Sequence, residues 1–348
     1  MNNHYTPFLL ALALLLLLAS CQHDDPEPRF KPEDQRTFLF LTPMGEIFDI
    51  NGKLVTQLPK CQYACGIISD KSDYFVSGIS QKERVGYWKN GKWNTLHVDF
   101  VDDVDHWIDG IGKWDYYLYL LDYPNVLKNS GIFPLEDSGN FLPAKQGLAV
   151  SEGKCYVVGS KKTDTSGGNY LPTLYTEHKG KYTYEMLPIG EDATLGECTC
   201  VYAYDATHTV IGGSINGRPA IWVDKQLQML PLSEPVSEED ESYAIGSVIL
   251  AIESNGEFYA VGTEPYHGND AVVTIWNNRS ISHLEFDPDH TISSDVVGLI
   301  GYGDDIYIAT VEYSFNENNE FTTTTVLWKN EVVVKAFAGV QTCGFTIV

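Results

Sequence analysis

The sequence predicts an all-β fold of the β-propeller class, and three observations lead to this prediction. Short hydrophobic runs alternate with turn residues along the chain, and no long amphipathic helix stands out. A strand pattern recurs with a period of about 40 to 50 residues, which is typical of four-stranded propeller blades. The N-terminal end lacks the inner strand of a blade, and the C-terminal end has one to spare. We therefore expect one closed ring over residues 37–348.

The recurring unit is an apolar strand, a tight polar turn and a second apolar strand that ends in a small residue. In five copies a 12-residue offset separates the first and last positions, and a weaker copy spans Ile108 to Leu121. The five copies run from Gly66 to Gly78, Gly147 to Gly159, Val201 to Gly213, Leu250 to Gly262 and Val297 to Ala309. Each copy supplies the first two strands of a predicted blade.

A hairpin whose first strand carries an aromatic residue follows several copies. The tryptophans Trp88, Trp222, Trp276 and Trp328 occupy equivalent positions in these hairpins. The Asn90-Gly91 pair after Trp88 is a strong hairpin signal, because both central residues of the turn need a positive φ. Equivalent positions in a repeat predict that the tryptophans pack between blades and do not form a ligand cage.

The chain termini predict how the ring closes. The N-terminal end supplies three strands, about Phe38 to Leu41, Glu46 to Ile50 and Lys53 to Leu58, with no inner strand before them. The C-terminal segment Gln341 to Val348 looks like Gln62 to Ser69 and then stops. Pairing the two ends removes an open sheet edge. Inner strands near residues 66, 109, 147, 201, 250, 297 and 344 give seven four-stranded blades; six blades, eight blades or a pair of β-sandwiches are the alternatives.

The N-terminus carries a targeting signal. The apolar run Phe8 to Leu18 is shorter than the roughly 20 residues that span a bilayer, and small residues follow it. Leu18-Ala19-Ser20-Cys21 resembles the lipobox of bacterial lipoproteins, although Met1 to Pro7 lacks Lys and Arg. The resemblance implies a signal peptide over residues 1–20, a lipid-modified (palmitate-bearing) Cys21 and a flexible acidic tether over 21–36. A plain secretory signal with a chance cysteine is the alternative.

The propeller repeats also resemble a known group. Gly212-Gly213 and the later Trp222 give one repeat a kelch-like character. Together with the lipobox, they make the chain similar to surface or periplasmic lipoproteins of Bacteroidetes-type bacteria. The resemblance implies a Gram-negative cell-envelope protein held by lipid, with the outer membrane as its expected location.

Composition limits the partners. The formal net charge is −24, and residues 1–20 contribute no charged side chain to it. Nucleic acid is therefore excluded as a favoured partner. An anionic membrane surface would repel the protein body, so attachment has to come from the lipid. Sugars, metal ions or a basic protein surface remain, and the oligomeric state is left open.

Six cysteines remain besides Cys21. The even number permits disulfides in an exported protein without establishing them. Cys61-x3-Cys65 and Cys198-x-Cys200 do not match the usual spacing of zinc ligands. We expect buried or disulfide-bonded cysteines.

The two faces of the predicted ring differ in loop length. Turns between strands one and two and between strands three and four are short, whereas the opposite face carries long, uneven connections. Long loops on a rigid scaffold usually carry the binding site. Because aromatic rings beside polar or charged groups suit sugars or cations, we predict ligand-binding residues in the long loops: Asp105, His106, Trp107, Tyr170, Tyr266, His267 and Tyr313.

One acidic run suggests calcium. Asp103, Asp105 and Asp109 are closely spaced and followed by Gly110, but their spacing does not match an EF-hand loop. No cofactor is otherwise expected, and Ca²⁺ is retained as an option.

We find no nucleophile elbow, zinc-protease motif, P-loop or sialidase-type repeat box. The leading hypothesis is therefore a non-enzymatic, lipid-anchored propeller that binds a carbohydrate or protein partner through its long-loop face. A carbohydrate-active enzyme using loop carboxylates, with or without Ca²⁺, is the first alternative. A scaffold subunit of an envelope complex is the second. Since residue 37 starts a second strand, we expect the tether to leave from the short-turn face.

Overall fold

The computed structural model describes residues 37–348 except 83, 97–107, 123, 130, 164–168, 234–245, 266–270, 287–290 and 317. The described residues form 28 strands and no helix. Consequently they include no helix long and apolar enough to cross a lipid bilayer. Five sheets have four strands each and a sixth has eight. The all-β, propeller-like arrangement that the sequence predicts is confirmed.

Each four-stranded sheet is antiparallel and runs from an inner strand to an outer strand. The sheet that joins the chain ends contains β28 (Gly344–Ile347), β1 (Phe38–Leu41), β2 (Glu46–Asp49) and β3 (Leu54–Gln57). The next contains β4 (Cys61–Asp70), β5 (Asp73–Ser80), β6 (Val85–Lys89) and β7 (Lys92–Thr95). A third contains β8 (Ile108–Trp114), β9 (Tyr117–Asp122), β10 (Asn125–Lys128) and β11 (Gly131–Pro134).

Two further sheets lie at the C-terminal end of this series. One contains β20 (Ser247–Ser254), β21 (Glu257–Pro265), β22 (Ala271–Asn277) and β23 (Ile281–His283). The other contains β24 (Thr291–Tyr302), β25 (Asp305–Phe315), β26 (Phe321–Lys329) and β27 (Val332–Ala338).

The eight-stranded sheet consists of two antiparallel sets of four strands. The first set is β12 (Phe141–Ser151), β13 (Lys154–Lys162), β14 (Tyr170–His178) and β15 (Lys181–Met186). The second is β16 (Gly196–Ala203), β17 (Thr209–Ile215), β18 (Arg218–Val223) and β19 (Gln226–Met229). A single parallel bridge, Gln146 to Cys200, joins the sets through β12 and β16.

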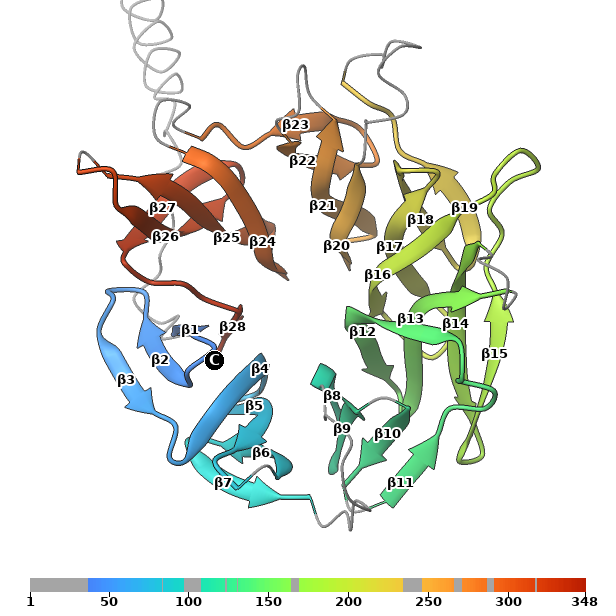
Figure 1. The fold of residues 1–348 in the computed structure, drawn as a ribbon, viewed down its shortest axis with the longest axis horizontal. Coiled ribbons are helices and arrows are strands. Elements are labelled where there is room, and N and C mark those ends of the chain that lie inside the picture. Colours follow the sequence, from blue (N-terminus) through green and yellow to red (C-terminus); the bar gives the residue numbers. More distant parts are fainter. Residues whose placement is uncertain are drawn as a thin grey trace, which may run out of the picture. The chain divides into compact units, whose positions relative to one another are not determined.

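The innermost strands follow one another around a centre. Contacts run from β4 through β8, β12, β16, β20, β24 and β28 and return to β4 (Figure 1). As the terminal repeats predict, the C-terminal β28 pairs with the N-terminal β1, in a register that places Gly344 opposite Leu41. Backbone hydrogen bonds of 3.0 Å in both directions between Thr37 and Val348 extend this pairing.

The small residues of the repeat have a structural cause. In most inner strands the pairing with the second strand is interrupted by a bulge, for example between Cys198 and Cys200. The bulge brings a carbonyl close to the neighbouring strand, so a Cβ at Gly213 would overlap the carbonyl oxygen of Glu197. Gly78 and Gly262 meet equivalent carbonyls. Only glycine permits this close approach without moving the backbone.

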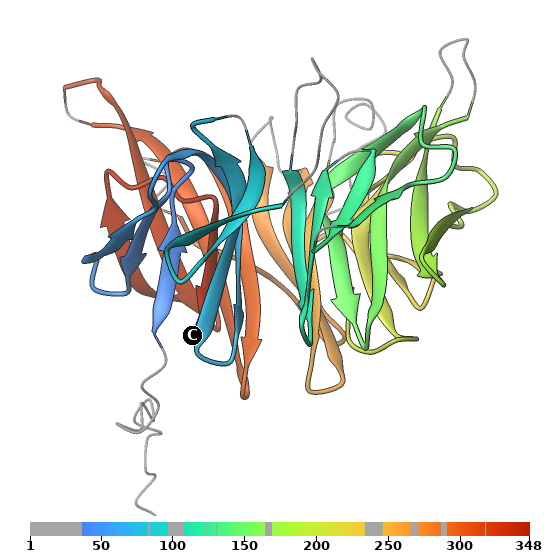
Figure 2. The same ribbon diagram turned by 90° about the horizontal axis from the view of Figure 1, so that it is seen from below.

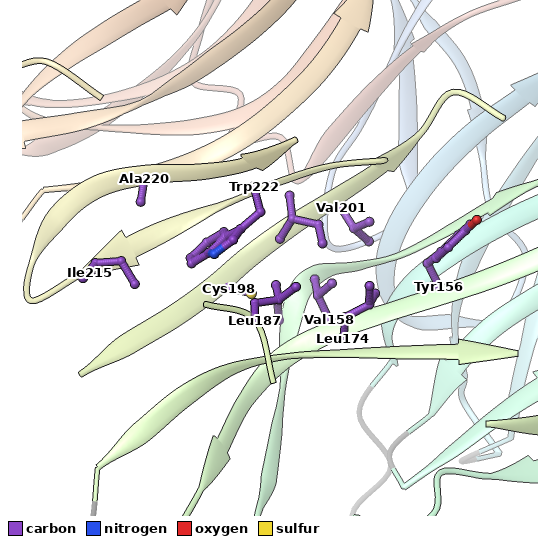
Figure 3. Packing of buried hydrophobic residues seen from close by; sticks show 11 residues of the cluster. Tyr156, Val158, Leu174, Leu187, Cys198, Val201, Ile215, Ala220 and Trp222 are labelled. Atoms are coloured by element: carbon purple, nitrogen blue, oxygen red, sulfur yellow. The ribbon is translucent and has the colours of Figure 1, made fainter. Parts of the chain in front are cut away.

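The repeated tryptophans join neighbouring sets of strands, as predicted. Trp222 of β18 is buried and packs on Leu187 and Val158 from the preceding set (Figure 3). Its indole Nε1 donates a hydrogen bond of 2.7 Å to the carbonyl of Pro188. Trp88 and Trp276 donate to Pro59 and Pro231 in the same way. In each case the segment after the fourth strand of the preceding set supplies a buried leucine and, next to it, the proline whose carbonyl accepts the hydrogen bond. These pairs are Leu58-Pro59, Leu187-Pro188 and Leu230-Pro231.

The two faces of the ring are defined by their turns. Turns between first and second strands and between third and fourth strands lie on what we call the short-turn face, together with the C-terminus (Figure 2). Many use residues with positive φ, such as Asn90-Gly91 and Asn255-Gly256. Because Thr37 pairs with Val348, the described chain also starts at this face, as expected. The opposite side, with the connections between second and third strands, is the long-loop face.

Candidate functional site

Most of the predicted site residues lie outside the described residues. These are Cys21, Asp103, Asp105, His106, Trp107, Tyr266 and His267. Asp109 belongs to β8, but only its backbone is described. Their ligand-binding, lipidation and calcium roles stay predictions. Among the described residues no group of three or more His, Cys, Asp or Glu side chains is placed to hold a metal ion.

Tyr170 and Tyr313 are described, and both lie in strands, where the sequence predicted loops. Tyr170 is the first residue of β14 and pairs with Lys162. Tyr313 lies in β25 and pairs with Thr323. Both hairpins extend further than predicted; in β26 the β-branched run Thr322 to Thr325 favours the extended ladder.

Both tyrosines lie toward the long-loop face, on sets of strands that are not neighbours. Tyr170 belongs to the set that begins with β12, and Tyr313 to the sheet that begins with β24; the sets of β16 and β20 lie between them (Figure 1). A small ligand bound at one tyrosine therefore would not contact the other.

Tyr313 is held in place by two polar side chains. Its hydroxyl donates a hydrogen bond of 2.8 Å to Oδ2 of Asp295 in β24. Gln341, in the connection from β27 to β28, donates from Nε2 to the same hydroxyl at 3.3 Å. Burial and the Asp295 carboxylate both raise the pKa of Tyr313. The phenol is thus a neutral donor in a fixed orientation at physiological pH.

Two exposed phenylalanines extend this tyrosine into a surface. The rings of Tyr313 and Phe321 stack with centroids 5.8 Å apart and an interplanar angle of 21°. Phe315 meets Phe321 edge-on at 6.0 Å. Phe321 is 59 % exposed and Phe315 is 46 % exposed. We call Tyr313, Phe315 and Phe321 the aromatic platform.

Asn316, beside the aromatic platform, binds two described neighbours, Asn318 and Glu320. Its Oδ1 accepts hydrogen bonds of 2.9 Å from the backbone N–H of both Asn318 and Glu320. Its Nδ2 donates to Oε2 of Glu320 at 2.9 Å. Phe315 and Phe321 pair across β25 and β26 directly beside these residues. The platform is therefore preorganised, which lowers the entropic cost of binding.

Sequence reasoning identified only part of this arrangement. It selected Tyr313 but missed Asp295, Phe321 and Gln341. Asp295 and Gln341 come from other strands or connections, so their proximity follows from the register of β24 with β25 and from ring closure. The two phenylalanines that flank the Asn-rich segment 316–320 were a local signal for an aromatic hairpin tip.

A second polar cluster lies below the long-loop face, around Glu264 of β21. This side chain is 1 % exposed. Its Oε1 lies 2.5 Å from Nε2 of His283 and accepts from Thr274 Oγ1 at 3.2 Å, while Oε2 accepts from the Ser233 backbone N–H at 2.9 Å. Burial raises the pKa of Glu264, but the contacts with His283 and Ser233 outweigh it and the net pKa is lowered. The cluster ties the connection after β19 to the next sheet.

Lys161 of β13 forms a third cluster on the same side. Its side chain is buried, and its Nζ lies 2.7 Å from Oδ2 of Asp137 and donates at 2.6 Å to the Asp137 carbonyl. The Nζ also lies 3.7 Å from the ring centroid of Tyr184. The hydroxyl of Tyr184 donates to the same carboxylate. The Lys161 ammonium is buried by these contacts, whereas the Asp137 side chain remains 72 % exposed, so the cluster holds the segment before β12 against β13.

Five of the described cysteines are buried and form no disulfide: Cys61, Cys155, Cys198, Cys200 and Cys343. Burial raises the pKa of Cys61 to about 11 and those of Cys155 and Cys343 to about 12. Such thiols are poor nucleophiles and metal ligands at neutral pH. The buried-cysteine expectation holds for these five residues.

Comparisons with known proteins support the fold. No protein-family model and no curated protein matches the chain. Among solved structures, a puromycin-hydrolyzing peptidase of Mycobacterium tuberculosis aligns with a TM-score of 0.55 and 12 % identity. The alignment covers 89 % of this chain and 53 % of the peptidase, so the chain spans about half of that protein.

The protein AofleA of Arthrobotrys oligospora, in a triple arginine mutant, aligns with a TM-score of 0.45 and 10 % identity, covering 83 % of this chain and 90 % of AofleA. A neuraminidase-like protein of subtype N11 aligns at 0.42 and 9 % identity, covering 76 % of this chain and 86 % of its own. At such identities the similarity concerns the fold. The peptidase alignment, with its TM-score of 0.55, agrees with the β-propeller-like all-β fold of this chain.

Proposed function

We propose that the protein is a lipid-anchored binding protein of the bacterial cell envelope and that its long-loop face binds a carbohydrate or protein partner. The observation that carries the proposal is the aromatic platform, in which the exposed rings of Phe315 and Phe321 extend the half-buried, hydrogen-bonded Tyr313. Aromatic faces pack against the C–H faces of sugar rings. Asp295, Gln341 and the Tyr313 hydroxyl supply hydrogen-bonding groups beside those rings. This combination favours a carbohydrate over a protein ligand.

We further propose that the ring has seven blades. The support is that seven inner strands contact in sequence, and that the eight-stranded sheet divides into two sets of four at the single bridge between β12 and β16. The kelch-like assignment has narrower support. It rests on Gly213, which the bulge requires, and on Trp222, which packs onto the preceding set.

The lipid anchor rests on the lipobox at Leu18 to Cys21 and on the proposed division into a signal peptide (1–20), a lipidated tether (21–36) and a propeller (37–348). We propose the outer membrane, on its periplasmic side or at the cell surface, as the location. Metabolic labelling with palmitate tests the anchor. We expect label in the wild-type chain and none in Cys21→Ser; label in both, or in neither, would contradict it.

A carbohydrate-active enzyme remains the second proposal, with support only from the acidic long loops. Glycoside cleavage by paired carboxylates needs one acid with a raised pKa. The described carboxyls with a displaced pKa, Asp73, Asp137, Asp205 and Glu264, all move downward. None of these four therefore fits the general acid of that reaction.

A glycan array tests the binding function. The mature chain, residues 21–348, is screened with and without Ca²⁺, which also tests the calcium option at Asp103, Asp105 and Asp109. Calorimetry on the strongest ligand then compares Tyr313→Ala/Phe321→Ala with the wild type. We expect at least about a tenfold loss of affinity, because stacked aromatic anchors dominate such sites. The triple change Trp107→Ala, Tyr170→Ala and Tyr266→Ala tests the other predicted residues.

The matched control is Tyr116→Ala, an 87 % exposed tyrosine on the short-turn face. We expect this variant to bind like the wild type. Equal affinity of the double variant and the wild type would overturn the platform assignment. Absence of any glycan ligand would leave a protein as the partner.

A further inference from the structure

Aromatic side chains are exposed at blade tips on the short-turn face, away from the proposed binding site. The turn between β8 and β9 exposes Trp114, Tyr116 and Tyr117. The turn between β16 and β17 exposes Tyr204. Tyrosine and tryptophan combine an apolar ring with a polar group, which is why they concentrate at membrane–water boundaries. This face therefore has side chains suited to such a boundary.

Aliphatic side chains add to the same face. β27 begins with Val332, Val333 and Val334, which are all exposed, Val332 to 68 %. β3 begins with Leu54 and Val55, each 48 % exposed. Both strands start at the short-turn face, because each follows the turn between a third and a fourth strand. Their sheets are neighbours in the ring.

The blade tips are joined to one another, so these side chains stand on a rigid surface. The Trp114 ring lies against Gly153 in the turn between β12 and β13. In that turn, Glu152 accepts a hydrogen bond of 3.4 Å from the Ala206 backbone N–H, and Lys154 donates at 3.1 Å to the Ala206 carbonyl. Ala206 belongs to the turn that carries Tyr204. Three consecutive tips thus form a connected arc.

The chain enters the ring at this face. Thr37 pairs with Val348, and the segment before it, residues 22–36, reaches at most about 50 Å when fully extended. An acylated Cys21 would therefore keep the short-turn face within reach of the membrane. We infer that the exposed apolar side chains of this face dock on the lipid surface that holds the anchor; this inference rests on the proposed lipid attachment for its orientation.

Apolar contact, and not charge, carries the docking. Exposed lysines such as Lys53, Lys71 and Lys181 stand at the same turns, but acids such as Asp115 and Glu152 stand among them. A mixed face gains little from an anionic surface, and the chain as a whole is strongly acidic. Burial of exposed rings and valines in the headgroup region is independent of ionic strength. Even a weak contact suffices, because a tether raises the effective concentration of the surface.

Vesicle flotation tests the inference without the lipid anchor. The mature chain, residues 21–348 with Cys21→Ser, is mixed with vesicles of phosphatidylethanolamine and phosphatidylglycerol. We expect measurable binding that Val333→Glu/Tyr116→Glu lowers by at least about fivefold. The control Met44→Glu changes a 64 % exposed side chain on the long-loop face and should bind like its parent. Raising NaCl from about 0.1 to 0.5 M should change binding little.

Failure to bind, equal binding of the double variant, or loss of binding in salt would overturn the inference. A concentration-dependent dimer in sedimentation that the double variant abolishes, without vesicle binding, would assign the face to a second copy of the chain. The anchor itself is tested separately by palmitate labelling of Cys21. Vesicle binding without palmitate labelling would refute the anchor and support the docking surface. Labelling without vesicle binding would support the anchor and refute the docking surface.

Discussion

The two faces of the ring place their charged side chains differently. On the long-loop side, Glu264 is 1 % exposed and Lys161 is 6 % exposed, and each is surrounded by several partners. On the short-turn face, ion pairs such as Lys329 with Asp305, 2.9 Å apart, remain in contact with water. Among the described residues, the buried charged side chains Lys161 and Glu264 lie on the long-loop side, and solvent-exposed ion pairs lie on the short-turn face.

This difference indicates how the ring can carry long loops on one side. A buried charge that loses its partner strongly destabilises the folded state. Glu264 and Lys161 therefore hold in place the loop segments that they contact. Exposed pairs contribute about 0 to 1 kcal/mol each and leave the surface free to change. We therefore expect mutations of charged side chains to be most destabilising below the long-loop face.

The largest effect should come from the bulge layer, which supports both faces. Gly213→Val would force a side chain into the carbonyl of Glu197, and backbone on both sides would have to move. We expect a loss of more than about 4 kcal/mol in the free energy of unfolding, or no folded protein. Urea unfolding followed by fluorescence measures this loss.

The control for Gly213→Val is Gly139→Ala. A Cβ at Gly139 meets no atom within 4 Å, so its effect should stay within about 0.5 kcal/mol. A stable Gly213→Val protein would show that the backbone at the bulge can move to accept a side chain. The close approach at Gly213 would then not be required for the stability of the ring.

The second largest effect concerns Glu264. Glu264→Ala removes the acceptor for Thr274 and for the Ser233 backbone N–H, and we expect a loss of about 2 to 4 kcal/mol. Asp305→Ala, its counterpart on the short-turn face, should cost less than about 1 kcal/mol. Equal losses in urea unfolding would remove the distinction between buried and exposed charges.

Acid titration should reveal the same group. The folded-state pKa of Glu264 is depressed below its ordinary value of 4.5. Its stabilising contribution is therefore complete above about pH 4.5 and is lost as the pH falls through the folded pKa. The difference in unfolding free energy between wild type and Glu264→Gln should shrink below that range, because a protonated Glu264 resembles Gln. A difference that grows toward low pH would show that the pKa of Glu264 is not lowered in the folded protein.

Local chemistry made much of the fold predictable. Turn residues such as Asn90-Gly91 and the repeated Trp88 and Trp222 act through their immediate neighbours, and the terminal repeats required β28 to pair with β1. The Leu-Pro pairs whose proline carbonyls accept the tryptophan N–H also recur along the sequence after the fourth strand.

The site was less predictable. Asp295 and Gln341 reach Tyr313 only through strand register and ring closure, and neither leaves a pattern along the chain. The burial of Glu264 depends on Ser233, which lies 31 positions earlier. In the sequence, polar residues near the ends of second strands resemble loop residues. In the structure, neighbouring segments bury them.

The smallest effect should come from Lys329→Met on the short-turn face. The side chain of Lys329 is only partly covered, and its partner Asp305 remains hydrated, so we expect a loss of at most about 1 kcal/mol that high salt removes. Lys161→Met should cost at least about twice as much and respond little to salt, because it strips a buried ammonium from the Asp137 carbonyl and from the Tyr184 ring. The ratio of the two losses in parallel urea titrations measures the asymmetry directly. Equal losses of unfolding free energy in Lys329→Met and Lys161→Met would show that the short-turn face is as strongly constrained as the long-loop side. A structural role of its exposed valines and tyrosines would then have to be tested before membrane contact is inferred.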